Sequence, residues 1–139
     1  MESKWTIGEI SARARVRVAT MRYYERRGLV PRPPRSVSNY RLYPEDTVRR
    51  VRFIKRAQEL GFSLKEIKEL LTLRAASGTR CEQVRERAAA KIKDIEEKVE
   101  SLRAMRTALS RLIVECAGQG PVTKGCPILE ALDEKEAKP

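Results

Sequence analysis

The fold of this chain is decided by one stretch near its start, TIGEISARARVRVATMRYYERRGLV, at residues 6–30. The stretch opens with the pattern of a capping box, because Thr6 can accept a hydrogen bond from the first turn of a helix and Glu9 follows three residues later. This pattern predicts a short helix over residues 7–14.

A second helix is predicted over residues 18–27, after a short connection. Val18, Met21 and Tyr24 recur at helical spacing and are expected to face the core, and Gly28 is expected to stop the helix. Two short helices joined by a tight turn are typical of helix-turn-helix DNA binding. We therefore interpret the start of the chain as a DNA-reading module.

The next segment, residues 29–43, contains prolines that prevent a continuous helix. It ends in alternating aromatic, basic and apolar residues, which indicate a small β-hairpin, here called the wing. A third helix should follow, with Pro44 in its first turn and Gly61 after its end. Its core-facing stripe comprises Val48, Val51, Ile54, Ala57 and Leu60.

A fourth helix is predicted next, because Ser63 and Glu66 repeat the capping-box pattern before further apolar residues at helical spacing. These elements predict a winged helix-turn-helix domain over residues 1–74. A polar hinge over residues 75–80 separates this domain from the rest of the chain.

The stretch over residues 81–116 has apolar residues on alternating three- and four-residue steps, broken only at Arg106, which is the spacing of a coiled-coil seam. One helix with such a seam buries nothing alone, so we expect it to be a dimerisation helix that forms a homodimer. The alternative is that it folds back on its own N-terminal domain, since Met105 and Leu112 widen the stripe. The seam comprises Ala88, Ile92, Ile95, Val99, Leu102, Leu109, Ile113 and Cys116.

Charge is divided unevenly along the chain. Residues 1–76 carry 18 Lys or Arg against 8 Asp or Glu, whereas residues 77–139 carry 12 against 11. A basic module joined to a nearly neutral one indicates that the first meets a polyanion, and nucleic acid is the expected one; the alternative is a well-solvated surface. Arginine supplies 14 of the 18 basic residues, and its planar fork suits phosphates and guanine edges.

Composition also limits location and chemistry. The longest apolar runs are too short to cross a bilayer and the start of the chain lacks a hydrophobic signal core, so we expect a cytoplasmic protein without a membrane partner. The chain contains no histidine, the commonest general base, and no phosphate-binding glycine loop. An enzyme is therefore not expected.

We interpret the 3 cysteines as ligands, because thiols stay reduced in the cytoplasm. Cys81 and Cys116 are 35 residues apart on one predicted helix, which at about 1.5 Å per residue separates them by roughly 50 Å. They cannot share a metal within one chain. If two such helices pair antiparallel, Cys81 of one chain lies beside Cys116 of the other, and the loop that follows can bring Cys126 to them.

Three sulfurs without imidazole form a soft, trigonal donor set, which favours Hg(II), with Pb(II), Cd(II) and Zn(II) as alternatives. For Cys116 alone the alternative is a packing residue, but Cys126 lies in a loop with no seam to fill. An iron–sulfur cluster would need four closely grouped cysteines, unless chains shared it. The predicted fold is mainly α: the winged helix-turn-helix domain, a long antiparallel coiled-coil dimerisation helix, and a short metal-binding loop and tail at residues 117–139.

The second helix is the expected reader of the major groove of DNA. Arg22 and Tyr23 are candidates for base-edge and sugar-phosphate contacts, with Arg17 and Thr20 beside the backbone. The wing and the start of the fourth helix add candidate phosphate contacts from Arg35, Tyr40, Arg41 and Lys65. The third helix presents either further contacts or a solvated face through Arg49, Arg50, Arg52 and Arg56.

Together these residues resemble the MerR family of transcription regulators over nearly the whole chain. The resemblance rests on the stretch at residues 6–30, on NYRLYPEDTVRRVRFIKRAQELGFSLKEIKELL at 39–71 and on GCPILEAL at 125–132. Within the family, the likeness is greatest to the mercuric-ion regulators.

The sequence departs from the family pattern at two places. The turn between the first two helices has Arg15 and Arg17, where the family commonly has a glycine and a small polar N-cap. Either this turn is strained, or the two side chains compensate by reaching phosphates. The loop between Cys116 and Cys126 is also slightly longer than is usual in the mercury-type members.

The resemblance implies a mechanism. A dimer would sit on an overlong promoter spacer, and metal binding would bend and untwist the DNA so that RNA polymerase engages both promoter elements and resistance genes are activated. Coordination by three thiolates across the dimer could supply the few kcal/mol that DNA distortion costs. The rival from another class is a thiolate metal-scavenging protein without gene regulation, which leaves the charge of the first module unexplained.

Overall fold

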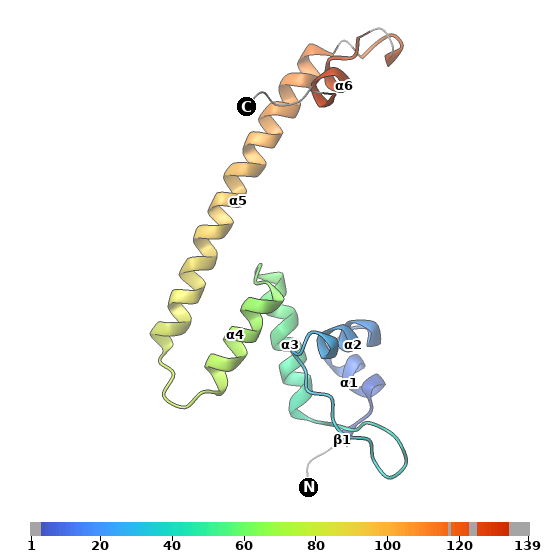
Figure 1. The fold of residues 1–139 in the computed structure, drawn as a ribbon, viewed down its shortest axis with the longest axis vertical. Helices are drawn as coiled ribbons and strands as arrows, with labels where there is room; N and C mark the ends of the chain where they lie inside the picture. Colours follow the sequence, from blue (N-terminus) through green and yellow to red (C-terminus); the bar gives the residue numbers. More distant parts are fainter. Residues whose placement is uncertain (1–3, 117, 123–124, 134–139) are drawn as a thin grey trace. The chain divides into compact units, whose positions relative to one another are not determined.

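The computed structural model describes residues 4–116, 118–122 and 125–133, and these are mainly helical, as predicted (Figure 1). The chain divides into two compact units, residues 1–91 and 92–139. The first unit contains β1 (Lys4–Trp5), α1 (Ile7–Ala14), α2 (Val18–Arg26), β2 (Tyr43–Pro44), α3 (Asp46–Glu59) and α4 (Leu64–Ala75). Helix α5 (Cys81–Glu115) begins in the first unit and continues into the second, which ends with α6 (Pro127–Leu132).

Both predicted capping boxes form. The Thr6 hydroxyl accepts from the backbone N–H of Glu9 at 3.2 Å, and Glu9 Oε1 accepts from the backbone N–H of Thr6 at 3.0 Å. These hydrogen bonds lower the pKa of the Glu9 carboxyl below its ordinary value. Ser63 and Glu66 make the same reciprocal pair at the start of α4. The sequence therefore places the starts of α1 and α4 correctly.

The core of the first unit lies between α1, α2, α3 and α4, as the sequence pattern predicts for most positions. Val18 and Leu60 were expected to face inward, but they are 38% and 51% exposed. Val18 is the first residue of α2 and Leu60 follows the last residue of α3, so both lie at helix ends. The buried apolar residues are Ile10, Ala14, Met21, Tyr24, Leu29, Val30, Tyr43, Val51, Ile54, Ala57, Ile67 and Leu71.

A two-stranded antiparallel sheet closes one end of this core. Trp5 lies opposite Tyr43, and Lys4 lies opposite Pro44. The prediction of Pro44 in the first turn of α3 is therefore wrong, because this proline ends β2 and α3 begins at Asp46. Proline is tolerated at the edge of a sheet, where its missing N–H is not needed.

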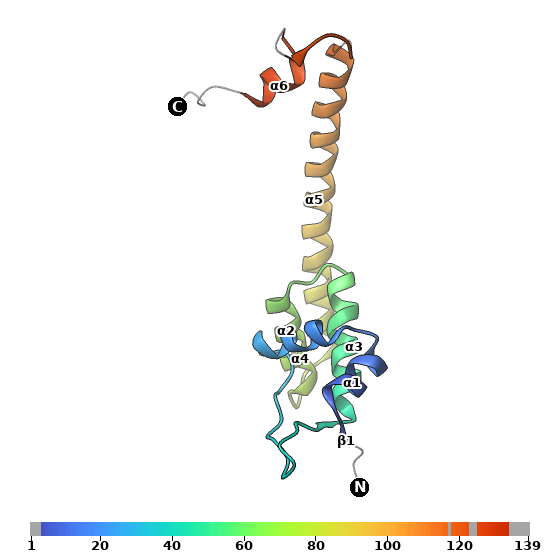
Figure 2. The same ribbon diagram turned by 90° about the vertical axis from the view of Figure 1, so that its right-hand side faces the viewer.

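The wing projects from the helices of the first unit, between α2 and α3 (Figures 1 and 2). Arg35 and Arg41 form an isolated antiparallel bridge across it. Asn39 turns the chain between them with a positive φ of 67°, a conformation that asparagine tolerates better than most residues. The segment is thus a short hairpin, as predicted.

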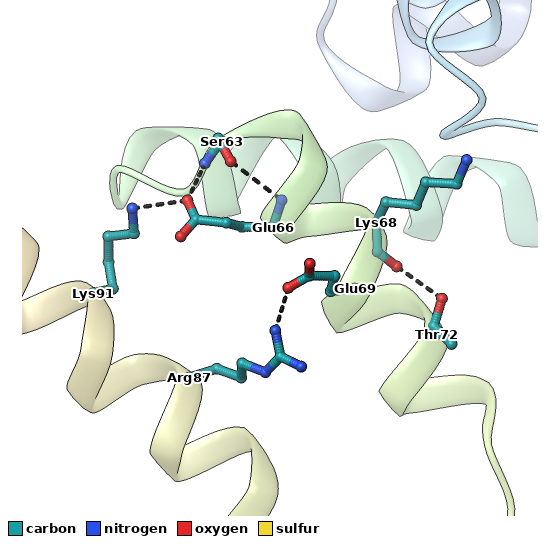
Figure 3. A network of polar contacts seen from close by, with 7 residues as sticks. All are labelled: Ser63, Glu66, Lys68, Glu69, Thr72, Arg87 and Lys91. Atoms are coloured by element: carbon teal, nitrogen blue, oxygen red, sulfur yellow. Dashed lines mark hydrogen bonds and ion pairs between the residues drawn. The ribbon is translucent and has the colours of Figure 1, made fainter.

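The beginning of α5 packs on α4 through two ion pairs (Figure 3). Lys91 is only 7% exposed, and its Nζ lies 2.8 Å from Glu66 Oε1 and 5.6 Å from the centre of the Phe62 ring. Arg87 pairs with Glu69 beside it. The Lys91 ammonium and the capping N–H at the start of α4 hold the pKa of the Glu66 carboxyl below its ordinary value. These contacts belong to the first unit.

No helix among the described residues is both long enough and apolar enough to span a membrane.

From Ile92 onward, the seam of α5 is exposed in the single chain. The exposed seam residues include Ile92 at 57%, Leu102 at 63% and Ile113 at 64%. A stripe of this kind on a helix that is otherwise charged is an incomplete interface.

Candidate nucleic-acid interface and metal centre

The turn between α1 and α2 is strained at Arg15. This residue caps α1 with φ 60° and ψ 42°, the left-handed region that disfavours side chains with a Cβ. Its carbonyl oxygen accepts from Lys55 Nζ at 2.9 Å, which helps to hold the conformation. Arg17 then precedes α2 without a side-chain capping hydrogen bond, and it is exposed. The turn is therefore strained, as the first alternative predicts, and contact of Arg15 and Arg17 with phosphates stays a prediction.

Helix α2 presents the predicted reading face to solvent. Arg22 and Tyr23 are exposed, and Thr20 is half-buried. Tyr24 points the other way, is 2% exposed and donates from its hydroxyl to Gln58 Oε1 at 2.6 Å. Its assignment to the core is confirmed. The contacts of the exposed side chains with DNA stay predictions.

The candidate residues of the wing differ in their surroundings. Tyr40 is 64% exposed, whereas Arg41 is half-buried. Arg41 Nε is buried and has no hydrogen-bond partner among the described residues. Arg35 Nη1 donates to the Asn39 carbonyl oxygen at 3.2 Å and so helps to shape the wing itself.

The arginines of α3 have different hydrogen-bond and ion-pair partners. Arg50 Nε donates to the Leu29 carbonyl oxygen at 2.6 Å, and Arg52 Nη2 donates to the Arg13 carbonyl oxygen at 2.6 Å. These two side chains therefore tie α3 to the ends of neighbouring elements. Arg56 pairs with Glu59 on its own helix. Arg50 is half-buried and Arg52 is exposed, so a wholly solvated face does not describe Arg50, and contacts of this set with DNA stay a prediction.

Two predicted DNA contacts from different elements affect the pKa of the same core residue. Burial and the hydrogen bond to Glu25 raise the pKa of the Tyr43 phenol to about 12, and the positive charges of Arg41 of the wing and Arg22 of α2 partly oppose the rise. Lys65 is exposed in the first turn of α4, away from any partner that would fix its side chain among the described residues.

Sequence reasoning missed Glu25, which lies three residues after Arg22 on α2. Its side chain is 3% exposed, and it pairs with Arg32. The signal was available, because an acidic residue in a strongly basic stretch needs a buried or charged partner to explain it. Sequence alone could not show that its partners lie in the wing.

Two of the three cysteines line one pocket in the second unit. The pocket has a volume of about 550 Å³ and includes Cys116 and Cys126 in its wall. Cys116 follows the last residue of α5 and Cys126 caps α6, and both thiols are free and half-buried. Residues 117 and 123–124, as well as the tail from 134 to 139, fall outside the described residues.

Cys81 lies at the other end of α5, as its first residue, and is exposed. Within the described part of the chain, no three potential ligands gather closely enough to hold a metal ion. This agrees with the separation calculated from the sequence, because a helix of 35 residues is about 50 Å long. The pair of thiols in the pocket fits a soft metal ion but offers fewer ligands than the predicted trigonal set.

Helix α6 was not predicted from the sequence, which indicated only a loop and tail. Cys126 and Pro127 mark its start, because proline is favoured in a first helical turn. The positive φ of Gly125, 89°, lets the chain turn into this helix. With only six residues, the helix was too short to give a periodic signal.

Two family models cover this architecture. Residues 5–74 match the MerR HTH family regulatory protein model, and residues 48–112 match the model described as MerR, DNA binding. The chain belongs to the MerR family of transcriptional regulators. A mercuric resistance operon regulatory protein of Serratia marcescens is 46% identical over 135 residues, which cover 96% of this chain and 91% of that protein.

Two solved MerR-family structures are similar along most of their length. The transcription regulator PbrR691 from Ralstonia metallidurans CH34, in complex with lead(II), has a TM-score of 0.79 and 36% identity, covering 92% of this chain and 98% of that one. MerR from Bacillus megaterium MB1, in complex with mercury(II) ion, has a TM-score of 0.65 and 37% identity, covering 94% and 100%. The chain is thus a MerR-family regulator of the metal-responsive type, and its relatives are regulators, not enzymes.

Proposed function

We propose that this regulator is a cytoplasmic homodimer that binds double-stranded promoter DNA and activates resistance genes when it binds Hg(II). Its effect on RNA polymerase would come through DNA distortion, whose cost is of order 1–6 kcal/mol for a short site. Metal favours whichever dimer conformation binds it more tightly, and this difference in affinity is the available source of that energy.

The observation that carries the proposal is the placement of the thiols. Cys116 and Cys126 share one pocket, whereas Cys81 begins the same long helix. In an antiparallel pair of α5 helices, Cys81 of one chain joins Cys116 and Cys126 of the other to give three sulfurs. The exposed seam of α5 supports the pairing, and the names of the mercuric relatives support the metal.

Lead is the second candidate ion, because the neighbour with the higher of the two TM-scores is in complex with lead(II). Cd(II) also suits a set of three sulfurs, whereas Zn(II) suits it less well, since zinc normally takes four ligands. A metal-scavenging protein would not need the basic winged module, whose candidate contacts are Arg17, Thr20, Arg22, Tyr23, Arg35, Tyr40, Arg41 and Lys65.

Mixed dimers test the shared site. One chain carries Cys81→Ser, and the other carries Cys116→Ser with Cys126→Ser. Neither homodimer retains a complete set of three thiolates, but a heterodimer restores one set. We expect the charge-transfer absorption of three-coordinate Hg(II)–thiolate in the heterodimer alone, and a weaker response when Pb(II) replaces Hg(II).

Transcription from the promoter is measured on the same samples, with the parent dimer as the control for full response. Absence of the three-coordinate absorption in verified heterodimers would show that the three sulfurs do not meet across the dimer. A larger response to Pb(II) than to Hg(II) would transfer the proposal to lead.

A further inference from the structure

Glu25 joins α2 to both sides of the wing. Its Oε2 accepts from Arg32 Nε at 3.2 Å, and its Oε1 accepts from the Tyr43 hydroxyl at 2.9 Å. Arg32 precedes the bridge between Arg35 and Arg41, and Tyr43 follows it. One carboxylate therefore closes the wing at its base.

Glu25 is held in place because each of its two carboxylate oxygens has a partner. A buried carboxylate is costly unless it is paired, and Glu25 satisfies one oxygen with a guanidinium and the other with a phenol. Tyr43 is 1% exposed and lies in β2, so the core and the strand fix the position of its ring. Burial, and then Glu25 itself, raises the pKa of Tyr43 to about 12, and the phenol stays a proton donor throughout the physiological range.

The position of the contact connects it to the candidate DNA surface. Arg22 lies one helical turn before Glu25 on the exposed face of α2, and Arg41 lies on the wing. The positive charges of both arginines act to lower the pKa of the Tyr43 phenol, whose hydroxyl donates a hydrogen bond to Glu25. The carboxylate thus lies where the major-groove element and the wing meet.

We propose that Glu25 is a positioning residue that locks the wing to α2, so that Arg22 and the wing residues Tyr40 and Arg41 approach DNA as one preformed surface. This inference rests on the proposed DNA binding but not on the metal. Without the lock, the wing must be ordered on binding, and that cost reduces affinity without the loss of any direct contact.

A double-mutant cycle tests the lock. Tyr43→Phe keeps the ring in the core and removes only the hydroxyl that Glu25 accepts from. The wing contacts are removed by Tyr40→Ala with Arg41→Ala. Affinity is measured for the DNA element that the metal-free parent dimer selects from random duplexes. We expect Tyr43→Phe to weaken binding about tenfold in the parent, in line with the loss of a charge-assisted hydrogen bond, but less than about twofold when the wing contacts are absent.

Tyr24→Phe is the matched control. It also removes a phenol hydroxyl from the core of the same unit, but that hydroxyl donates to neutral Gln58 on α3. We expect it to leave affinity within about twofold of the parent in both backgrounds. Arg32→Gln gives an independent test on an exposed side chain, and it should weaken binding in the same wing-dependent way.

The dependence of affinity on salt provides a readout that a general loss of stability would not change. Release of the wing should make the slope of log affinity against log salt concentration less steep, by the amount expected for the loss of about one phosphate contact. Equal losses from Tyr43→Phe with and without the wing contacts would overturn the lock while leaving DNA binding intact. If the parent dimer selects no duplex at all, the proposed function and the lock both fail.

Discussion

The first unit buries its apolar residues within one chain, whereas the seam of α5 beyond Lys91 leaves them in solvent. Ile54 of α3 is 0% exposed, but Leu102 of α5 is 63% exposed. Both residues lie on regular apolar stripes of long helices. The difference is that α3 packs on α1 and α4, whereas the seam residues of α5 that the structure describes beyond Lys91 stay exposed.

This contrast separates two kinds of stability. Replacing a residue in the first unit should change an intramolecular equilibrium that does not depend on protein concentration. Replacing a residue of the seam should change an association equilibrium that does. The predictions below test whether the first unit and the seam differ in this way.

The largest effect is expected from a charge on the seam. In a paired seam Leu102→Glu would bury an unpartnered carboxylate, so we expect dimerisation to weaken roughly a hundredfold or more, with a matching loss of operator binding. Ile54→Ala should instead lower the free energy of unfolding of the first unit by about 2–5 kcal/mol at every protein concentration.

Sedimentation equilibrium measures the first variant and chemical denaturation the second. Ser101→Glu, which introduces the same charge one position off the seam, is the control and should remain dimeric. A monomeric parent protein, or a Leu102→Glu variant as dimeric as the parent, would remove the assignment of this stripe to self-association.

A smaller effect is expected at alkaline pH in the first unit. The Tyr43 phenol has its pKa raised from 10.0 to about 12 by burial and by its hydrogen bond to Glu25. Its contribution to stability is complete below pH 10.0, because both folded and unfolded states hold the proton there, and it is lost as pH rises towards about 12.

We therefore expect the parent to lose stability over that range more steeply than Tyr43→Phe, by up to about one proton in the slope of unfolding free energy against pH. Denaturation series at several alkaline pH values measure the two slopes side by side. Parallel curves would mean that the unfolded and folded states release this proton together. The association equilibrium of α5 should show no such difference between the two proteins.

The smallest effect is expected at the turn between α1 and α2. Arg15→Gly should remove the cost of a Cβ at φ 60°, about 1 kcal/mol, partly offset by the greater freedom of glycine in the unfolded chain. Arg13→Gly, inside the last turn of α1, should do the reverse and destabilise by about 1 kcal/mol. Thermal melts of the two variants compare the sites directly, and a destabilised Arg15→Gly protein would show that the side chain outweighs the backbone strain.

Much of the fold was predictable because its signals are local. The capping boxes at Thr6 and Ser63 specify helix starts through side chains only three residues apart. The alternating steps of α5 also reveal a long helix without any tertiary information. What failed lies at helix ends or in very short elements: Val18 and Leu60 are exposed, Pro44 belongs to a strand, and α6 has too few residues for periodicity.

The candidate sites also contain some features that follow from local sequence and others that depend on tertiary packing. The sequence names the three cysteines and implies their separation along α5, because distance along a helix follows from residue number. It could not show that Arg50 and Arg52 donate to distant carbonyl oxygens, or that Glu25 meets Tyr43, since those contacts depend on how α2, α3 and the wing pack. The same helical spacing fits an arginine that faces phosphate and one that faces a carbonyl.

Glu66 connects the start of α4 to α5. The same carboxylate oxygen that accepts from the Ser63 N–H to cap α4 also receives Lys91 from α5. A rotation of α5 that withdrew Lys91 would leave this carboxylate with its capping role alone, and a frayed cap would in turn displace the partner of the lysine. The first turn of α4, which carries Lys65, and the turn of α5 around Lys91 are therefore coupled through one carboxylate, so that a change in the position of either turn alters the hydrogen bonding of the other.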